Sequence, residues 1–126
     1  EQFLIDAAFR YSDLTPEERG QQFYTELGCA GCHSLDGRPG VGPTWAGLYM
    51  HEVLLTDGTT VIADDAYIRD SIIHPNNQIV AGFMPHILPQ DYEGRIGNLE
   101  AEILASEGAE LDVIADLIAF IQTLDQ

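Results

Sequence analysis

The sequence has no lysine, only five arginines, only two cysteines and no long hydrophobic segment. Against those five cations stand 21 acidic side chains, which gives a formal net charge of −16. So acidic a surface repels the phosphates of nucleic acids and the anionic headgroups of lipids. The charge therefore argues against nucleic acid as a partner, and it favours a protein partner with either a basic docking face or an apolar one.

The length and the hydrophobic content indicate one globular domain. The chain has 126 residues, 45% of them hydrophobic, which is enough for a single core. No run approaches the roughly 18 apolar residues that a membrane span needs, so no span is expected. An export signal or a membrane anchor is expected only upstream of Glu1, because the chain shows no signal segment.

Capping signals and hydrophobic periodicity predict a mainly helical domain with one small β-hairpin. The segment TPEE, residues 15–18, is a capping box with proline in the first turn, and it predicts a helix that ends near Leu27. Asp57-Gly58 separates two short apolar segments and predicts a hairpin near 52–62. Further helices are expected over residues 65–73, 98–107 and 109–124.

The two cysteines stand three positions apart and a histidine follows them, in the segment CAGCHS, residues 29–34. C-x-x-C-H is the signature of covalent haem c attachment. Two thiols add to two vinyl groups along one side of the haem, and two intervening residues let the chain turn between them. The next residue then reaches the iron. The motif predicts Cys29 and Cys32 as attachment sites and His33 as an iron ligand.

Three other uses of two close cysteines fit the sequence less well. A thioredoxin-like redox pair needs a strand before the motif, whereas the preceding segment is predicted to be helical. A zinc site needs two more ligands at a recognisable spacing, and no second close pair is present. A disulfide across two intervening residues would stabilise the fold little.

A six-coordinate iron needs a second axial ligand, for which Met84 is the leading candidate. It lies in GFMP, residues 82–85, within a loop long enough to fold over the far side of the haem. A thioether raises the reduction potential, whereas a second histidine lowers it. His86 and His74 remain alternatives, and Met50 is expected to fill the core. An open or labile sixth position would instead indicate a haem enzyme or a gas-binding sensor.

Several segments together resemble a known family, the class I c-type cytochromes. These segments are CAGCH, GPTWAGL (42–48), the Asp-Gly hairpin, YIRDSIIHPN (67–76) and LIAFIQTL (117–124). The chain is most similar to the cytochrome c domain of subunit II of haem-copper oxygen reductases and to its soluble relatives. The resemblance covers residues 15–126, and it implies a class I cytochrome c fold of about five helices around one haem. Residues 1–14 are then an N-terminal extension, expected to pack on this body.

The resemblance also implies roles for individual residues. The first and last helices of the family cross near the haem, where Gly20 and Phe120 fall, with Phe23 or Tyr24 beside them. Pro43 matches the proline that lies over the haem, and its region orients His33. The residues expected at the haem propionates are Arg38, Trp45 and Tyr49, with Arg38 favoured because propionates are anions.

The function implied by the resemblance is one-electron transfer and not enzymatic catalysis. The carrier would take electrons from a quinol-oxidising complex and pass them to a terminal oxygen reductase of a respiratory chain. Its cofactor would be one covalent haem c with His33 and Met84 on the iron. Attachment of haem c takes place on the outer face of the energy-transducing membrane, which implies a periplasmic location. A monomer is expected.

Overall fold

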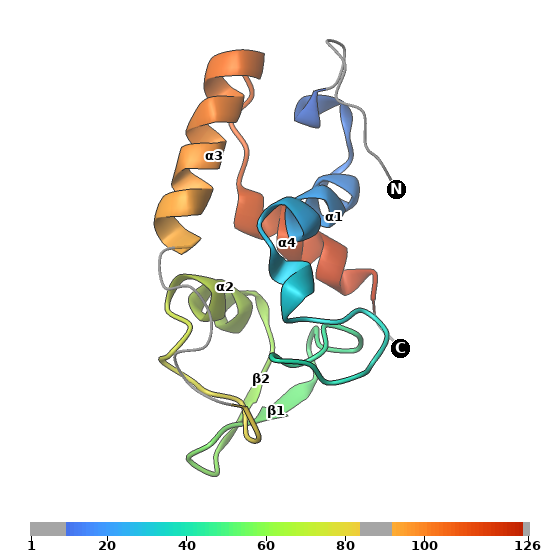
Figure 1. The fold of residues 1–126 in the computed structure, drawn as a ribbon, viewed down its shortest axis with the longest axis vertical. Coiled ribbons are helices and arrows are strands. Elements are labelled where there is room, and N and C mark those ends of the chain that lie inside the picture. Colours follow the sequence, from blue (N-terminus) through green and yellow to red (C-terminus); the bar gives the residue numbers. More distant parts are fainter. Residues whose placement is uncertain (1–9, 84–91, 125–126) are drawn as a thin grey trace.

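The computed structural model describes residues 10–83 and 92–124, and this part of the chain is mainly helical (Figure 1). Four α-helices and one two-stranded antiparallel sheet lie within it, as the sequence leads one to expect. In chain order they are α1 (Pro16–Glu26), β1 (Glu52–Leu54), β2 (Thr60–Ile62), α2 (Asp65–Ile73), α3 (Tyr92–Glu107) and α4 (Val113–Gln122). Short 3-10 turns occupy Tyr11–Asp13 and Cys29–Gly31.

Helix α1 begins where its sequence predicts. The Thr15 hydroxyl accepts a hydrogen bond from the N–H of Glu18 at 3.2 Å, and the Glu18 carboxylate accepts one from the N–H of Thr15 at 2.9 Å. This reciprocal pair satisfies two backbone donors that the first turn leaves without partners. The helix ends at Glu26, and Gly28 follows in the left-handed conformation with φ of 81°.

Helices α1 and α4 cross in close contact at the centre of the domain (Figure 1). A Cβ placed on Gly20 would lie 2.1 Å from the Asp116 carbonyl oxygen and 2.6 Å from the Phe120 Cβ. Only glycine lets the two backbones approach this closely. Phe23 and Leu117 are completely buried at this crossing, and the hydrophobic core extends from it.

A buried ion pair also joins the crossing helices. The guanidinium of Arg19 binds the carboxylate of Asp116 through two nitrogens, at 2.8 Å and 3.3 Å, and the two side chains are only 14% and 7% exposed. A third guanidinium nitrogen donates to the carbonyl of Leu14 at 2.7 Å. The two parallel bonds and the extra acceptor hold the buried charges in one geometry.

Two helices differ in extent from the prediction. Helix α3 begins at Tyr92 and not near 98, so it brings its first turns against the body of the domain. Helix α4 begins at Val113, where the Asp112 carboxylate accepts from the N–H of Ala115 at 3.1 Å. Residues 109–112 were predicted to be helical but are not. The Asp112 cap makes α4 begin four residues later than its hydrophobic periodicity suggests.

The part of the N-terminal extension that the structure describes lies against α1 and α3. The ring of Tyr11 stacks on Phe23 with centroids 5.2 Å apart. The Glu107 carboxylate accepts from the N–H groups of Tyr11 and Ser12, both at 2.9 Å. Residues 1–9 lie outside the described residues, so the packing of the whole extension stays a prediction. Across residues 10–83 and 92–124, none of the helices combines the length and the hydropathy needed to cross a membrane.

Candidate haem-binding site

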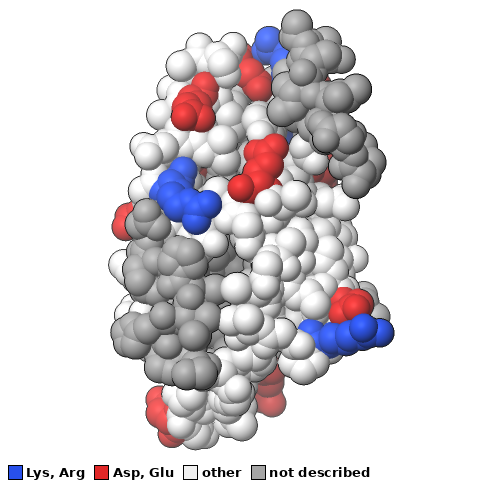
Figure 2. Space-filling model, viewed as in Figure 1, with Lys and Arg blue, Asp and Glu red and all other residues white. Residues whose placement is uncertain are grey.

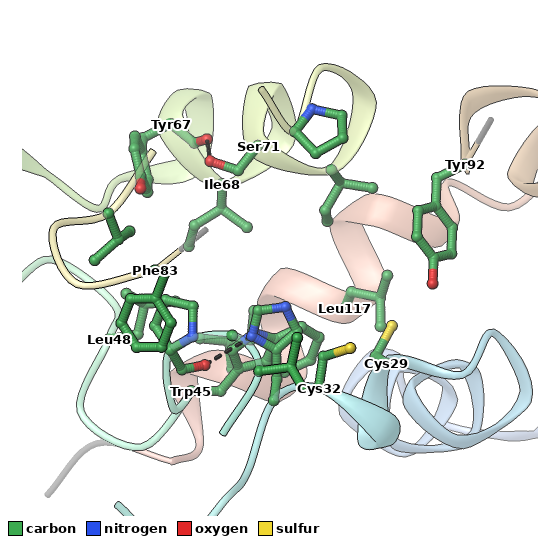
Figure 3. Close-up of a pocket in the computed structure, with 18 of the residues that line it drawn as sticks. Cys29, Cys32, Trp45, Leu48, Tyr67, Ile68, Ser71, Phe83, Tyr92 and Leu117 are labelled. Atoms are coloured by element: carbon green, nitrogen blue, oxygen red, sulfur yellow. Dashed lines mark hydrogen bonds between the residues drawn. The ribbon is translucent and has the colours of Figure 1, made fainter. Parts of the chain in front are cut away.

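One predominantly apolar pocket lies between α2 and the loop that follows α1 (Figure 3). Tyr67 and Ser71 of α2 lie on one side of it, and Cys29, Cys32 and Trp45 lie on the other. The remaining walls come from α3, α4 and the hairpin, through Tyr92, Ile96, Leu117, Ile121 and Val53. Apolar walls of this kind exclude water from a bound planar group and lower the local dielectric.

The cysteines reach this pocket because α1 stops just before them. After Gly28 the chain makes a 3-10 turn, in which the N–H groups of Cys32 and His33 both donate to the Cys29 carbonyl, at 3.2 Å and 3.0 Å. Both thiols therefore line the same pocket as the His33 ring. The spacing of the motif thus places three chemically distinct groups together.

The environment of Cys29 does not match that of a thiolate. Burial raises the pKa of the Cys29 thiol to about 11, and the nearby charge of Arg95 opposes this only in part. Redox-active pairs instead rely on a lowered thiol pKa. Within the part of the chain that the structure describes, no three His, Cys, Asp or Glu side chains are arranged to hold a metal ion. The raised pKa of the Cys29 thiol argues against the thioredoxin-like interpretation.

The imidazole of His33 has a defined tautomer. Its Nδ1 lies 2.7 Å from the Pro43 carbonyl oxygen, and a carbonyl only accepts, so Nδ1 carries the proton and Nε2 keeps its lone pair. Burial lowers the pKa of His33, although the bond to Pro43 opposes this shift, and the neutral ring is favoured. A neutral imidazole with a free nitrogen in an apolar pocket, beside two thiols, fits the requirements of covalent haem c.

Gly42 makes room for this ring. A Cβ at Gly42 would lie 2.6 Å from Cε1 of His33 and 3.0 Å from its Nδ1. Any side chain there would push the imidazole away from the Pro43 carbonyl. The loop is further tied by the Thr44 hydroxyl, which donates to the Ser34 carbonyl at 3.1 Å, and by the Trp45 N–H, which donates to the same carbonyl at 2.9 Å.

The structure brings together only some of the predicted site residues. Pro43 and Trp45 line the pocket with the two cysteines and His33. Arg38 is exposed and pairs with Asp36 at 3.7 Å, and Tyr49 donates to Asp65 at 2.5 Å. Neither Arg38 nor Tyr49 lines the pocket in the described residues, and the contacts expected of them stay predictions.

Two of the candidates for the sixth iron ligand lie outside the described residues. Met84 and His86 lie outside the described residues, so Met84 stays a prediction from the sequence. His74 directly follows α2 as its C-cap residue and is not among the described pocket residues, although the next residue, Pro75, is. The expectation that Met50 fills the core is wrong, because its side chain is 53% exposed and its φ is +64°.

Sequence reasoning missed the contribution of α3 to the site. Tyr92 and Ile96 of this helix line the pocket, and Tyr92 lies on the same side of it as Cys29 (Figure 3). The Tyr92 hydroxyl donates to the Leu27 carbonyl at 3.2 Å, and Arg95 donates to the same oxygen at 3.4 Å while lying over the Tyr92 ring. The spacing of Tyr92 and Ile96 by four residues was a usable signal, since it puts both on one helix face.

Charge is unevenly placed on the face of the molecule that Figure 2 shows. Charged side chains lie around a broad uncharged area on this face. Val41, a side chain that is 51% exposed, also lines the pocket, so the pocket rim includes apolar surface open to solvent.

A mainly helical fold whose pocket is lined by the thiols of Cys29 and Cys32 and by the imidazole of His33 is that of a protein that carries covalent haem c. Comparison with known proteins names the family: the cytochrome c model matches residues 17–125. The chain belongs to the cytochrome c family, as its motifs predict, and its cofactor is covalently bound haem c with its iron. Electron transfer through haem is the activity that the family supports.

One solved structure that resembles this chain is cytochrome cH from Methylobacterium extorquens. The two are 17% identical, the match covers 85% of this chain and 97% of that one, and the TM-score is 0.46. Among curated proteins no sequence match was found.

Proposed function

We propose that this chain is a one-electron carrier of a respiratory chain, which takes electrons from a quinol-oxidising complex and delivers them to a terminal oxygen reductase. The observation that carries the proposal is the His33 imidazole, held through Nδ1 by Pro43 with Nε2 free, in an apolar pocket that both cysteines line. Bound haem c supplies exchange of one electron between the ferric and ferrous states of its iron.

The proposal assigns Cys29 and Cys32 to thioether bonds with the haem and Nε2 of His33 to its iron. Met84 is assigned to the sixth position from its place in the sequence, in GFMP, residues 82–85. Two strong-field axial ligands leave no position for a substrate, and this is what separates a carrier from a haem enzyme or gas sensor.

The surrounding residues keep the histidine in a single state. The Pro43 carbonyl retains the proton on Nδ1, and burial disfavours the doubly protonated imidazolium. Leu117 and Ile121 of α4, with Ile68 of α2, supply apolar walls that exclude water. A dry, preorganised site changes little between oxidation states, which favours rapid electron transfer.

The surface suggests how the carrier meets its partners. The net charge of −16 attracts a partner with a basic face, and the uncharged area in Figure 2 provides a contact without charge repulsion. The proposed location is the periplasm, or the equivalent outer face of the membrane, and the proposed state is a monomer. Rates of electron transfer that stay constant with ionic strength would exclude the basic partner.

Carbon monoxide tests the carrier function directly. Addition to the reduced holoprotein should leave the visible spectrum unchanged, because both axial positions are filled. Met84→Ala should bind carbon monoxide, while Met50→Ala, which removes an exposed methionine that does not line the pocket, should not. A clear spectral change in the unaltered protein would point instead to gas binding or peroxide chemistry.

A further inference from the structure

The indole of Trp45 packs against the imidazole of His33. The two ring centroids are 5.2 Å apart, and the ring planes are inclined by 29°. Trp45 is only 6% exposed, and its backbone N–H is tied to the carbonyl of Ser34, the residue next to His33. The indole is therefore fixed close to the histidine by the backbone as well as by burial.

Trp45 is in turn supported by the helix crossing. The Tyr24 ring lies 5.0 Å from the Trp45 ring and 5.8 Å from the Phe120 ring, centroid to centroid. The Tyr24 hydroxyl donates to the carbonyl of His33 itself. The aromatic contacts thus run without a gap from α4, through α1, to the histidine ring.

The hydrogen bond to Pro43 cannot by itself fix the plane of the imidazole. It restrains one ring atom, Nδ1, and the ring remains able to pivot about that bond. A flat, immobile neighbour packed against the ring removes this freedom, because any pivot would bring the ring atoms into overlap with it. The backbone of Gly42 also lies close to the ring, since a Cβ added there would lie within 3.2 Å of three ring atoms.

We propose that Trp45 is a positioning residue that sets the plane of the His33 imidazole, with Tyr24 holding the indole in place. This role rests on the proposed function, in which His33 is an axial ligand. It differs from a contact with the haem propionates, since Trp45 acts through the histidine. An imidazole that keeps one plane in both oxidation states reduces the reorganisation that each electron transfer requires.

The test uses proton NMR of the oxidised holoprotein. In ferric haem proteins the paramagnetically shifted haem methyl resonances depend on the planes of the axial ligands. Trp45→Leu should change the order or the spread of these resonances, and Trp45→Phe, which keeps a flat ring, should retain the pattern of the unaltered protein. Phe23→Leu is the matched control, because it shortens a completely buried aromatic that does not line the pocket.

Three outcomes separate the possible failures. An unchanged methyl pattern in Trp45→Leu, together with a stability loss equal to that of Phe23→Leu, would overturn the positioning role. An unaltered protein without histidine-ligated, low-spin iron would overturn the proposed function itself. If Trp45→Leu does not fold, Trp45→Met fills the space without a flat ring, and an unchanged pattern there would refute the role equally.

Discussion

The close approach of α1 and α4 at Gly20 gives the sharpest stability prediction. In Gly20→Ala the new Cβ would start 2.1 Å from the Asp116 carbonyl oxygen and 2.6 Å from the Phe120 Cβ. The first contact is with backbone, so no side-chain rotation relieves it, and α1 and α4 must separate. Overpacking costs about 1–3 kcal/mol, and a clash with backbone belongs at the upper end of that range. Alanine recovers only about 1 kcal/mol of helix propensity, so the net loss is about 2 kcal/mol.

The opposite result is expected at Gly97, which lies in α3 with no atom within 4 Å of an added Cβ. Gly97→Ala should stabilise the protein by about 0.5–1 kcal/mol through helix propensity alone. Thermal unfolding followed by circular dichroism compares the two variants. Gly20→Ala should lower the melting temperature by roughly 5–10 °C, and an increase like that of Gly97→Ala would refute the close crossing.

Three further predictions follow from charged groups. Asp116→Asn should lower the free energy of unfolding by up to about 3 kcal/mol in denaturant titrations, because it leaves the largely buried Arg19 charge without its partner. A loss as small as that of the exposed Asp36→Asn would contradict this. Partial burial raises the pKa of Glu107, but the N–H groups of Ser12 and Tyr11 outweigh it, and the folded pKa lies below the usual value. The stabilisation is therefore complete above the ordinary glutamate pKa of about 4.3 and is lost as pH falls through the folded pKa; a constant stability difference from Glu107→Gln across this acid range would exclude the linkage. Arg95→Gln removes a partly screened positive charge near Cys29. It should therefore lower the reduction potential of the holoprotein by roughly 10–30 mV in a redox titration. An unchanged potential would show that solvent screens the charge fully.

Much of the site follows from the sequence because its information is local. The cysteine spacing and Gly28 after the helix end each act on neighbours within a few residues. The capping box of α1 and the hairpin turn at Asp57-Gly58 are equally local, and both occur where they were expected. Propensity and turn chemistry suffice for such features.

The starts of α3 and α4 differ from those predicted. The local Asp112 cap sets the start of α4, whereas for α3 the spacing of Tyr92 and Ile96 is a weak signal that long-range contacts reinforce. Tyr92 belongs to a helix because its ring packs on the pocket and its hydroxyl reaches the Leu27 carbonyl, 65 residues earlier in the chain. Met50 was assigned to the core by residue type, yet it is exposed at a positive φ, where its backbone N–H donates to the Ala63 carbonyl at 2.8 Å. At Met50, contacts between distant segments override local preference.

The sequence by itself indicated the haem c cofactor and the mainly helical fold, because covalent attachment requires a fixed set of residue types at fixed spacing. It also predicts His33 as an iron ligand. Only the tertiary structure decided which nitrogen of His33 is free, since that depends on where the Pro43 carbonyl lies. It also placed Trp45 on the histidine and Tyr92 beside Cys29. These arrangements depend on the packing of α1, α3 and α4 against one another, and side-chain packing is a property of the whole fold that no short segment encodes.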